Sequence, residues 1–171
     1  MNNKFALLLI AMSLLACNFL FPQTQPAVPE STDFQDPVPT GFTIERLHPK
    51  DGELQALLAS EAQKAAALSQ MPVVEFDATW CPPCQAIDRA IRAKDELILN
   101  AYAGTYIIKL DVDEWGWGDS NLHNFEFSAI PVYFKLDSAG NQTGEVIDGG
   151  AWGEDIPENI APVMDKFFHG N

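Results

Sequence analysis

Basic residues are scarce in this sequence. Ten lysines and arginines stand against 24 aspartates and glutamates in 171 residues, which gives a formal net charge of −14 at pH 7. The chain also contains no run of basic residues. A surface with this much negative charge repels phosphate backbones, so nucleic acid is excluded as a partner. The charge favours basic partners or serves solubility alone.

Cysteine and histidine are also rare, with three residues of each type. The histidines, His48, His123 and His169, share no spacing typical of metal ligands. Zinc held by Cys81 and Cys84 would need two further ligands, which the histidines do not offer at a sensible spacing. We therefore expect neither a metal nor another cofactor, and capture of zinc or copper by the two cysteines is the alternative.

The N-terminal apolar run, residues 5–15, is too short to cross a membrane, which takes about 20 residues. Lys4 precedes this run and small residues follow it, a pattern typical of a secretory signal peptide over residues 1–16. Residues 14–17, Leu-Leu-Ala-Cys, resemble the bacterial lipobox, in which cleavage leaves a lipidated cysteine at the new N-terminus. The alternative is an ordinary cleaved signal, with Cys17 lost or left as a spare thiol.

Residues 17–40 are rich in proline and show no helical or strand period. We predict that they form a tether from lipidated Cys17, which would anchor the chain to a membrane of the bacterial cell envelope, facing the periplasm or exterior. A leader without a role is the alternative. Acylation of Cys17 leaves Cys81 and Cys84 as a closed pair. A bridge across two residues constrains little chain, so we expect its purpose to be chemical.

Residues 41–171 are predicted to form one folded domain. Apolar residues recur at helical spacing over residues 53–69, and the buried-looking runs 72–78 and 105–112 enclose a helical segment that reaches about residue 99. A strand, a helix and a strand in this order imply parallel strands with a right-handed crossover. The remaining predicted elements are a strand near 42–44, a hairpin of 132–136 with 143–147, and a final helix from about 156. Asp155 and Glu158 are expected to cap this helix, and Pro162 should kink it or start a new turn.

Cys81 and Cys84 lie where a strand-like run meets a helical segment. Residues three apart in the first turn of a helix have Cα atoms roughly 5–6 Å apart, within the range that a disulfide requires. The helix N-terminus favours a thiolate, so Cys81 is predicted to be the nucleophile and Cys84 the residue that resolves the mixed disulfide. Pro82 and Pro83 lack N–H groups, which leaves the N–H groups of Cys84 and Gln85 as donors to the thiolate.

The residues that flank this pair include no lysine, arginine or histidine. A moderate fall in the thiol pKa is therefore expected, which favours a reductase or isomerase over an oxidase.

The sequence from Val74 to Cys84 resembles the active-site strand and helix of the thioredoxin superfamily. Residues 108–113 resemble the following strand, residues 129–134 the cis-proline strand, and residues 144–150 the final strand with its glycine turn. The resemblance covers about residues 41–171. It implies an α/β fold whose central mixed sheet of about four to five strands is flanked by helices on both faces. It also implies thiol–disulfide exchange by Cys81 and Cys84.

The resemblance also implies roles for residues around the cysteines. Glu75 would accept the proton of Cys84, and Lys109 would tune the pKa of Glu75. An isolated charge in a buried strand is costly, which favours pairing of the two side chains. The alternative is that both side chains reach solvent at strand ends. Trp80 would shelter the site, and Ile130, before a cis peptide bond to Pro131, would pair with an extended substrate segment.

Trp115 and Trp117 depart from the family pattern. Two interpretations are open: the pair lines a groove for a partner, or it serves packing within the loop.

The hypothesis from the sequence is a membrane-anchored thiol–disulfide oxidoreductase that reduces or isomerises disulfides of exported proteins. Its partners would be protein disulfides in the cell envelope and a membrane electron donor that reduces the pair again. A disulfide oxidase is the alternative within this class. A non-catalytic binding module or holdase, in which the fold presents the groove beside Pro131, is the alternative in another class.

Overall fold

The computed structural model describes residues 41–117, 122 and 125–170. The predicted signal peptide (1–16), the lipidated Cys17 and the tether (17–40) lie outside the described residues. Within the part of the chain that is described, no helix is both long and apolar enough to span a bilayer.

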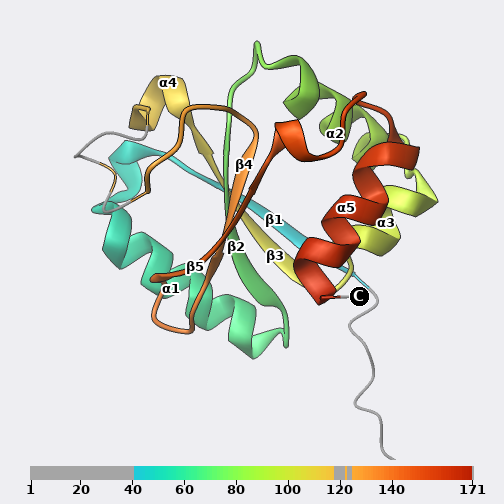
Figure 1. Ribbon diagram of the computed structural model, residues 1–171. Helices are drawn as coiled ribbons and strands as arrows, with labels where there is room; N and C mark the ends of the chain where they lie inside the picture. Colours follow the sequence, from blue (N-terminus) through green and yellow to red (C-terminus); the bar gives the residue numbers. More distant parts are fainter. Residues whose placement is uncertain (1–40, 118–121, 123–124, 171) are drawn as a thin grey trace, which may run out of the picture. The chain divides into compact units, whose positions relative to one another are not determined.

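A five-stranded mixed sheet forms the centre of the domain (Figure 1). The strand order is β1-β3-β2-β4-β5. The first three strands in this order are parallel, β4 is antiparallel to β2, and β5 is antiparallel to β4, which confirms the predicted parallel pair and the predicted hairpin. The bounds of the strands are β1 Thr43–Leu47, β2 Met71–Asp77, β3 Thr105–Asp111, β4 Val132–Leu136 and β5 Gln142–Asp148.

Helices cover both faces of this sheet (Figure 1). One face packs against α1 (Leu54–Ala67), and the other packs against α2 (Pro82–Arg92), α3 (Glu96–Tyr102) and α5 (Pro157–His169). Neighbouring strand residues point to opposite faces, so Val74 joins the cluster with α1 and Val73 joins the cluster with the other three helices. Both valines are fully buried, as expected for a strand covered on both sides. The predicted α/β architecture is confirmed.

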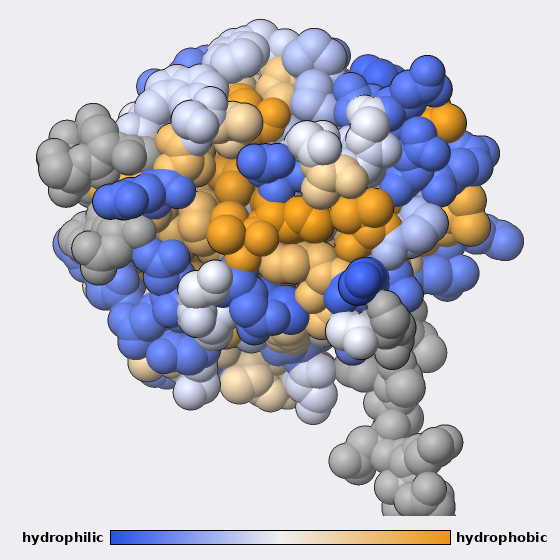
Figure 2. Space-filling view, in the orientation of Figure 1, coloured by the Kyte–Doolittle hydropathy of each residue, from blue (hydrophilic) through white to orange (hydrophobic). Residues whose placement is uncertain are grey.

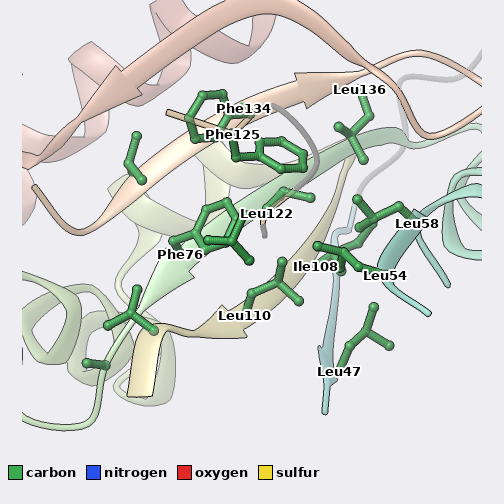
Figure 3. Packing of buried hydrophobic residues seen from close by; sticks show 14 of the residues in the cluster. Leu47, Leu54, Leu58, Phe76, Ile108, Leu110, Leu122, Phe125, Phe134 and Leu136 are labelled. Carbon is green, nitrogen blue, oxygen red and sulfur yellow. The ribbon is translucent and has the colours of Figure 1, made fainter. Parts of the chain in front are cut away.

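The segment between β3 and β4 also contributes to the core (Figure 3). It begins with the short helix α4 (Val112–Trp115). Leu122 and Phe125 are buried in the same cluster as Phe76 and Phe134. The Phe125 ring lies 5.3 Å from the Phe76 ring and 5.0 Å from the Phe134 ring between centroids. These contacts tie Leu122 and Phe125 to the sheet.

The predicted active-site helix is interrupted. Instead of running to about residue 99, α2 ends at Arg92 and α3 begins at Glu96. Lys94 adopts a left-handed conformation with φ of 58°. The Asp95 carboxylate then accepts hydrogen bonds from the N–H groups of Leu97 and Ile98, which starts the second helix.

The start of α5 also differs from the prediction. Ile156, not Asp155, is the N-cap residue, and no side chain caps the helix. Asp155 instead accepts a hydrogen bond from the indole N–H of Trp152 at 3.0 Å. The helix continues through Pro162 to His169. Two 3-10 turns complete the described elements, Pro49–Asp51 before α1 and Gly149–Ala151 after β5.

The edge strand β5 is largely exposed. Figure 2 shows a band of apolar side chains over β5 and the neighbouring α5. Ile147, Val163 and Phe167 line a groove there, and the Lys135 ammonium lies 5.2 Å from the centre of the Phe167 ring. Lys135 also pairs with Glu145 at 2.7 Å. Charged side chains at an edge strand hinder pairing with a second sheet.

Candidate active site

Cys81 and Cys84 are joined by a disulfide at the start of α2, with their Cα atoms 5.3 Å apart. Cys81 is the N-cap residue, and its sulfur accepts a hydrogen bond from the N–H of Cys84 at 3.3 Å. The predicted placement of the two residues is therefore confirmed. Pro82 occupies the first helical position. The N–H of Gln85 donates to the Cys81 carbonyl oxygen rather than to its sulfur.

Pro131 lies at the same end of the sheet. Phe76 pairs with Val132 in the antiparallel register of β2 and β4, which places Pro131 beside the carboxyl end of β2, shortly before Cys81. The Ile130–Pro131 peptide bond is cis, as the resemblance implied. Ile130 packs against the core cluster that contains both cysteines.

A glycine turn supports this proline. The N–H of Gly149 donates to the Pro131 carbonyl oxygen at 2.9 Å. A Cβ atom at residue 149 would lie 3.1 Å from Pro131 Cδ, so glycine allows the close approach.

A row of polar side chains crosses the face of the sheet that packs against α2. The strand register places Arg46, Lys109, Glu75 and Tyr133 on four neighbouring strands in this order. Glu75 has no exposed surface and Lys109 is 4% exposed, so the alternative that both reach solvent is wrong. The Lys109 ammonium lies 3.2 Å from a Glu75 carboxylate oxygen, an ion contact rather than a well-formed hydrogen bond.

Two further carboxylates surround the lysine. The Lys109 ammonium lies 2.8 Å from Asp88 Oδ1 and 3.2 Å from Asp77 Oδ2. Arg46 in turn holds Asp77 through two hydrogen bonds of 2.9 and 2.6 Å. Three acids thus meet two bases, and one proton on the cluster would balance its charge. Asp88 is the most exposed of the three acids, with a third of its side chain in contact with solvent.

The Glu75 carboxylate is the group in this cluster that binds that proton most readily. Burial raises the pKa of its carboxyl group to about 7, and although Lys109 opposes the shift, Asp77 and Asp88 add to it. Burial lowers the pKa of Lys109, but the same three carboxylates outweigh burial and raise it, so the lysine stays charged. Glu75 therefore changes charge near neutral pH beside a permanent cation.

Tyr102 and Tyr133 border this carboxyl group. Their hydroxyl oxygens lie 3.0 Å apart in the core. Burial, and after it the charge of Glu75, raises the pKa of both phenols well above the ordinary value, so both stay protonated. Because both phenols remain neutral, Glu75 is the group that titrates near neutral pH at this contact.

The sequence interpretation missed Asp77, Asp88, Arg46 and Tyr133. Asp77 follows Glu75 by two residues and so lies on the same face of β2, and Asp88 follows Cys84 by one helical turn. These spacings could have indicated both acids. Arg46 and Tyr133 depend on which strands become neighbours, and the sequence alone does not define that register.

The Glu75 carboxyl group should make stability depend on pH. Its pKa of about 7 exceeds the ordinary value of 4.5, so between these values the folded chain keeps a proton that the unfolded chain loses. The free energy of unfolding should therefore fall on the order of 3 kcal/mol from this group as the pH rises from 4.5 to 7, and level off above. Urea unfolding of the wild type and of Glu75→Gln at several pH values measures the difference. A constant difference between the two proteins would contradict this assignment.

The tryptophans near the disulfide have separate environments. Trp115 donates its indole N–H to the Leu47 carbonyl oxygen at 3.0 Å, so loop packing is the correct interpretation for this residue. Trp80 donates its indole N–H to Asp113 at 2.8 Å. Trp117 stacks on Trp80, with ring centroids 6.1 Å apart and planes inclined by 26°.

Metal binding gains no support from these contacts. Among the residues that the structure describes, no three His, Cys, Asp or Glu side chains are grouped so that they could hold a metal ion. Cys17, the predicted lipidation site, lies outside the described residues, and so does His123.

Comparisons with known proteins place this geometry in context. The model of the thioredoxin family matches residues 56–161. A thioredoxin of Staphylococcus haemolyticus is 36% identical over 103 residues, covering 57% of this chain and 83% of the relative. A thioredoxin of Staphylococcus aureus is 33% identical over 98 residues with the same shares of both chains. A solved thioredoxin of Trichomonas vaginalis has 26% identity and a TM-score of 0.46, covering 72% of this chain and 96% of that protein.

Proposed function

The chain belongs to the thioredoxin family, and from this premise we propose that it reduces or isomerises disulfides of exported proteins through Cys81 and Cys84. The observation that carries this proposal is the Cys81–Cys84 disulfide at the start of α2, with the Cys84 N–H directed at the Cys81 sulfur. A helix N-terminus and a backbone donor both stabilise a thiolate on Cys81.

In the first step, the Cys81 thiolate attacks one sulfur of a substrate disulfide. The substrate S–S bond breaks, a mixed disulfide forms, and the second substrate sulfur leaves as a thiolate that takes a proton from solvent. Ile130 and the cis Pro131 would support the substrate backbone during this step, since they lie at the same end of the sheet.

In the second step, the Cys84 thiol loses its proton and attacks the Cys81 sulfur. The mixed disulfide breaks, the remaining substrate sulfur leaves as a thiolate and is protonated, and Cys81 and Cys84 become a disulfide. Two electrons have then passed to the substrate.

We assign the Cys84 proton to Glu75. This carboxyl group is buried, its pKa is about 7, and neither of its oxygens has a well-formed hydrogen bond in the described structure. A base whose pKa lies near the working pH is suited to such a transfer. Lys109 stabilises the Glu75 carboxylate before the transfer. Asp88 contacts Lys109 and is partly exposed, so it connects the buried cluster to solvent, where the proton can be released.

The direction of electron flow can be measured directly. Equilibration of the Cys81/Cys84 couple with glutathione gives its reduction potential, and a reductase should lie near about −270 mV. The absence of basic side chains flanking the pair supports this expectation, because the thiol pKa is then lowered only moderately. A value near about −120 mV would instead identify a disulfide oxidase.

We also propose that the protein works at a membrane of the bacterial cell envelope. The pattern of residues 1–17 supports cleavage before Cys17 and lipidation of its sulfur, with residues 17–40 as the tether. A membrane electron donor would then reduce the disulfide again after each turnover. Labelling of producing cells with radioactive palmitate tests the anchor: the wild type should take up label and Cys17→Ser should not. Equal labelling of both would contradict the proposal.

A further inference from the structure

An exposed aromatic surface adjoins the disulfide and has no role in the steps above. It consists of the exposed Trp80 and Trp117 together with the partly buried Phe127, and we name it the aromatic shelf. Trp80 is 53% exposed and Trp117 is 41% exposed. Large aromatic faces in solvent, held in fixed positions, are typical of surfaces that contact a partner.

The shelf is built rigidly. The Asp113 carboxylate holds the Trp80 indole, Trp117 stacks on Trp80, and the Phe127 ring lies 6.2 Å from Trp117 between centroids. Phe127 in turn lies 4.5 Å from the Phe76 ring in the core. An unbroken row of aromatic rings therefore joins the sheet to the surface.

The shelf lies along the path of a substrate. Trp80 immediately precedes Cys81, and Phe127 precedes the cis Ile130–Pro131 bond by a few residues. A polypeptide that pairs with the backbone at Ile130 while its sulfur meets Cys81 would present its neighbouring side chains to this surface.

The surroundings of the shelf are acidic. Residues 78–88 and 112–130 contain no lysine or arginine. Asp113, which accepts a hydrogen bond from the Trp80 indole, is exposed. Glu114 and Glu126, the neighbours of Asp113 and Phe127 in the sequence, are exposed as well, and Glu114 contacts His48 at 2.6 Å. Among the described residues, no lysine or arginine forms an ion pair with Asp113 or Glu126.

We propose that the aromatic shelf selects protein substrates that carry an arginine or lysine next to the cysteine under attack. The statement rests on the function proposed above and names the substrate class of the same site. A cation over the face of a tryptophan is attracted by the ring, and nearby carboxylates add to the attraction. Arginine suits the shelf best, since its planar guanidinium stacks on an aromatic face while it donates to a carboxylate. The net charge of −14 agrees with basic partners.

The test uses matched peptides, each with one cysteine bound to glutathione as a mixed disulfide. They differ only in the residue before the cysteine: arginine, norleucine or glutamate. With the reduced protein, kcat/KM for the arginine peptide should exceed that for the glutamate peptide by about tenfold at low salt. The ratio should shrink in 0.5 M NaCl, because exposed charges are screened.

Variants assign this preference to the shelf. Trp117→Ala should reduce the ratio to about twofold, while Trp117→Phe, which keeps an aromatic face, should retain most of it. Leu68→Ala changes another exposed apolar residue, at the C-terminus of α1, and should leave the ratio unchanged. Leu68→Ala should also reduce a small uncharged disulfide at the wild-type rate.

The outcomes separate the two proposals. Equal rates for the arginine and glutamate peptides, or a preference for norleucine over arginine at every salt concentration, would overturn the shelf proposal alone. Failure of the reduced wild type to turn over even the small disulfide would overturn the proposed function, and the shelf proposal with it. An unchanged ratio in Trp117→Ala would show that the preference arises elsewhere and would also overturn the shelf proposal.

Discussion

Replacement of Cys81 by serine should reduce the rate of insulin reduction by at least about a thousandfold. A serine hydroxyl is not ionised near neutral pH, and it cannot form the mixed disulfide through which exchange proceeds. Cys84 remains in this variant, but it lies inside α2 and lacks the N-cap position at which the Cys81 sulfur accepts a backbone hydrogen bond. We therefore expect little compensation from the second cysteine. The increase in turbidity as insulin chains separate measures the rate.

Leu68→Ala serves as the control in this assay, because Leu68 is exposed and lies at the end of α1 rather than at the disulfide. The circular dichroism of Cys81→Ser should match that of the reduced wild type, since serine is nearly isosteric with cysteine. Full activity of Cys81→Ser would remove the catalytic claim and favour a non-catalytic binding module.

Replacement of Lys109 by methionine should lower the free energy of unfolding by about 3–5 kcal/mol at pH 8. The lysine is 4% exposed and contacts Glu75, Asp77 and Asp88, so its loss leaves buried negative charge without a partner. Asp77 retains Arg46, and Asp88 is partly solvated, which leaves Glu75 as the main source of the loss. Urea unfolding monitored by tryptophan fluorescence provides the measurement.

The same variant should be less affected at pH 5. Glu75 can take up a proton there, because burial raises its pKa to about 7 and removal of Lys109 raises it further. Addition of Glu75→Gln to Lys109→Met should recover most of the stability at pH 8 for the same reason.

A second lysine provides the matched control. Lys64 also contacts a buried glutamate, Glu61, at 2.7 Å, but its own side chain is 58% exposed. Glu61 keeps a hydrogen bond from Tyr106 when that lysine is lost. Lys64→Met should therefore cost no more than about 1 kcal/mol. Equal losses in the two lysine variants would refute the view that Lys109 is essential to a buried cluster.

Local sequence patterns were sufficient to predict the individual strands and the position of the cysteine pair, whereas the mixed sheet was implied by the family resemblance. The run from residue 72 to residue 78 and the helix after Cys81 carry strong local signals, and both are present with small differences at their ends. The predicted helix to residue 99 was wrong because Lys94 and Asp95 end one helix and cap another. The sequence signal for this break consists of only these two residues, and the apolar residues on both sides of it continue at helical spacing.

The charged cluster around Lys109 was predicted only in part. Glu75 and Lys109 were found because a charge within an apolar run is conspicuous. Asp88 and Arg46 lie on other elements whose sequences are amphipathic, so a charged residue there is not unusual and gives no signal. Only the parallel register of β1 with β3 and the packing of α2 on the sheet bring them to the lysine. Similarly, the stacking of Trp117 on Trp80 follows from tertiary structure that local patterns do not encode.

The proposed function depends most on covalent exchange at Cys81, and trapping with Cys84→Ser tests this exchange most directly. Without the second thiol, the mixed disulfide cannot be resolved and should accumulate. Reduced Cys84→Ser mixed with insulin should yield an adduct with one insulin chain, which mass spectrometry locates at Cys81 and which excess dithiothreitol releases. The double variant Cys81→Ser/Cys84→Ser should yield none. Absence of an adduct from Cys84→Ser, or an adduct located only at Cys17, would contradict the account.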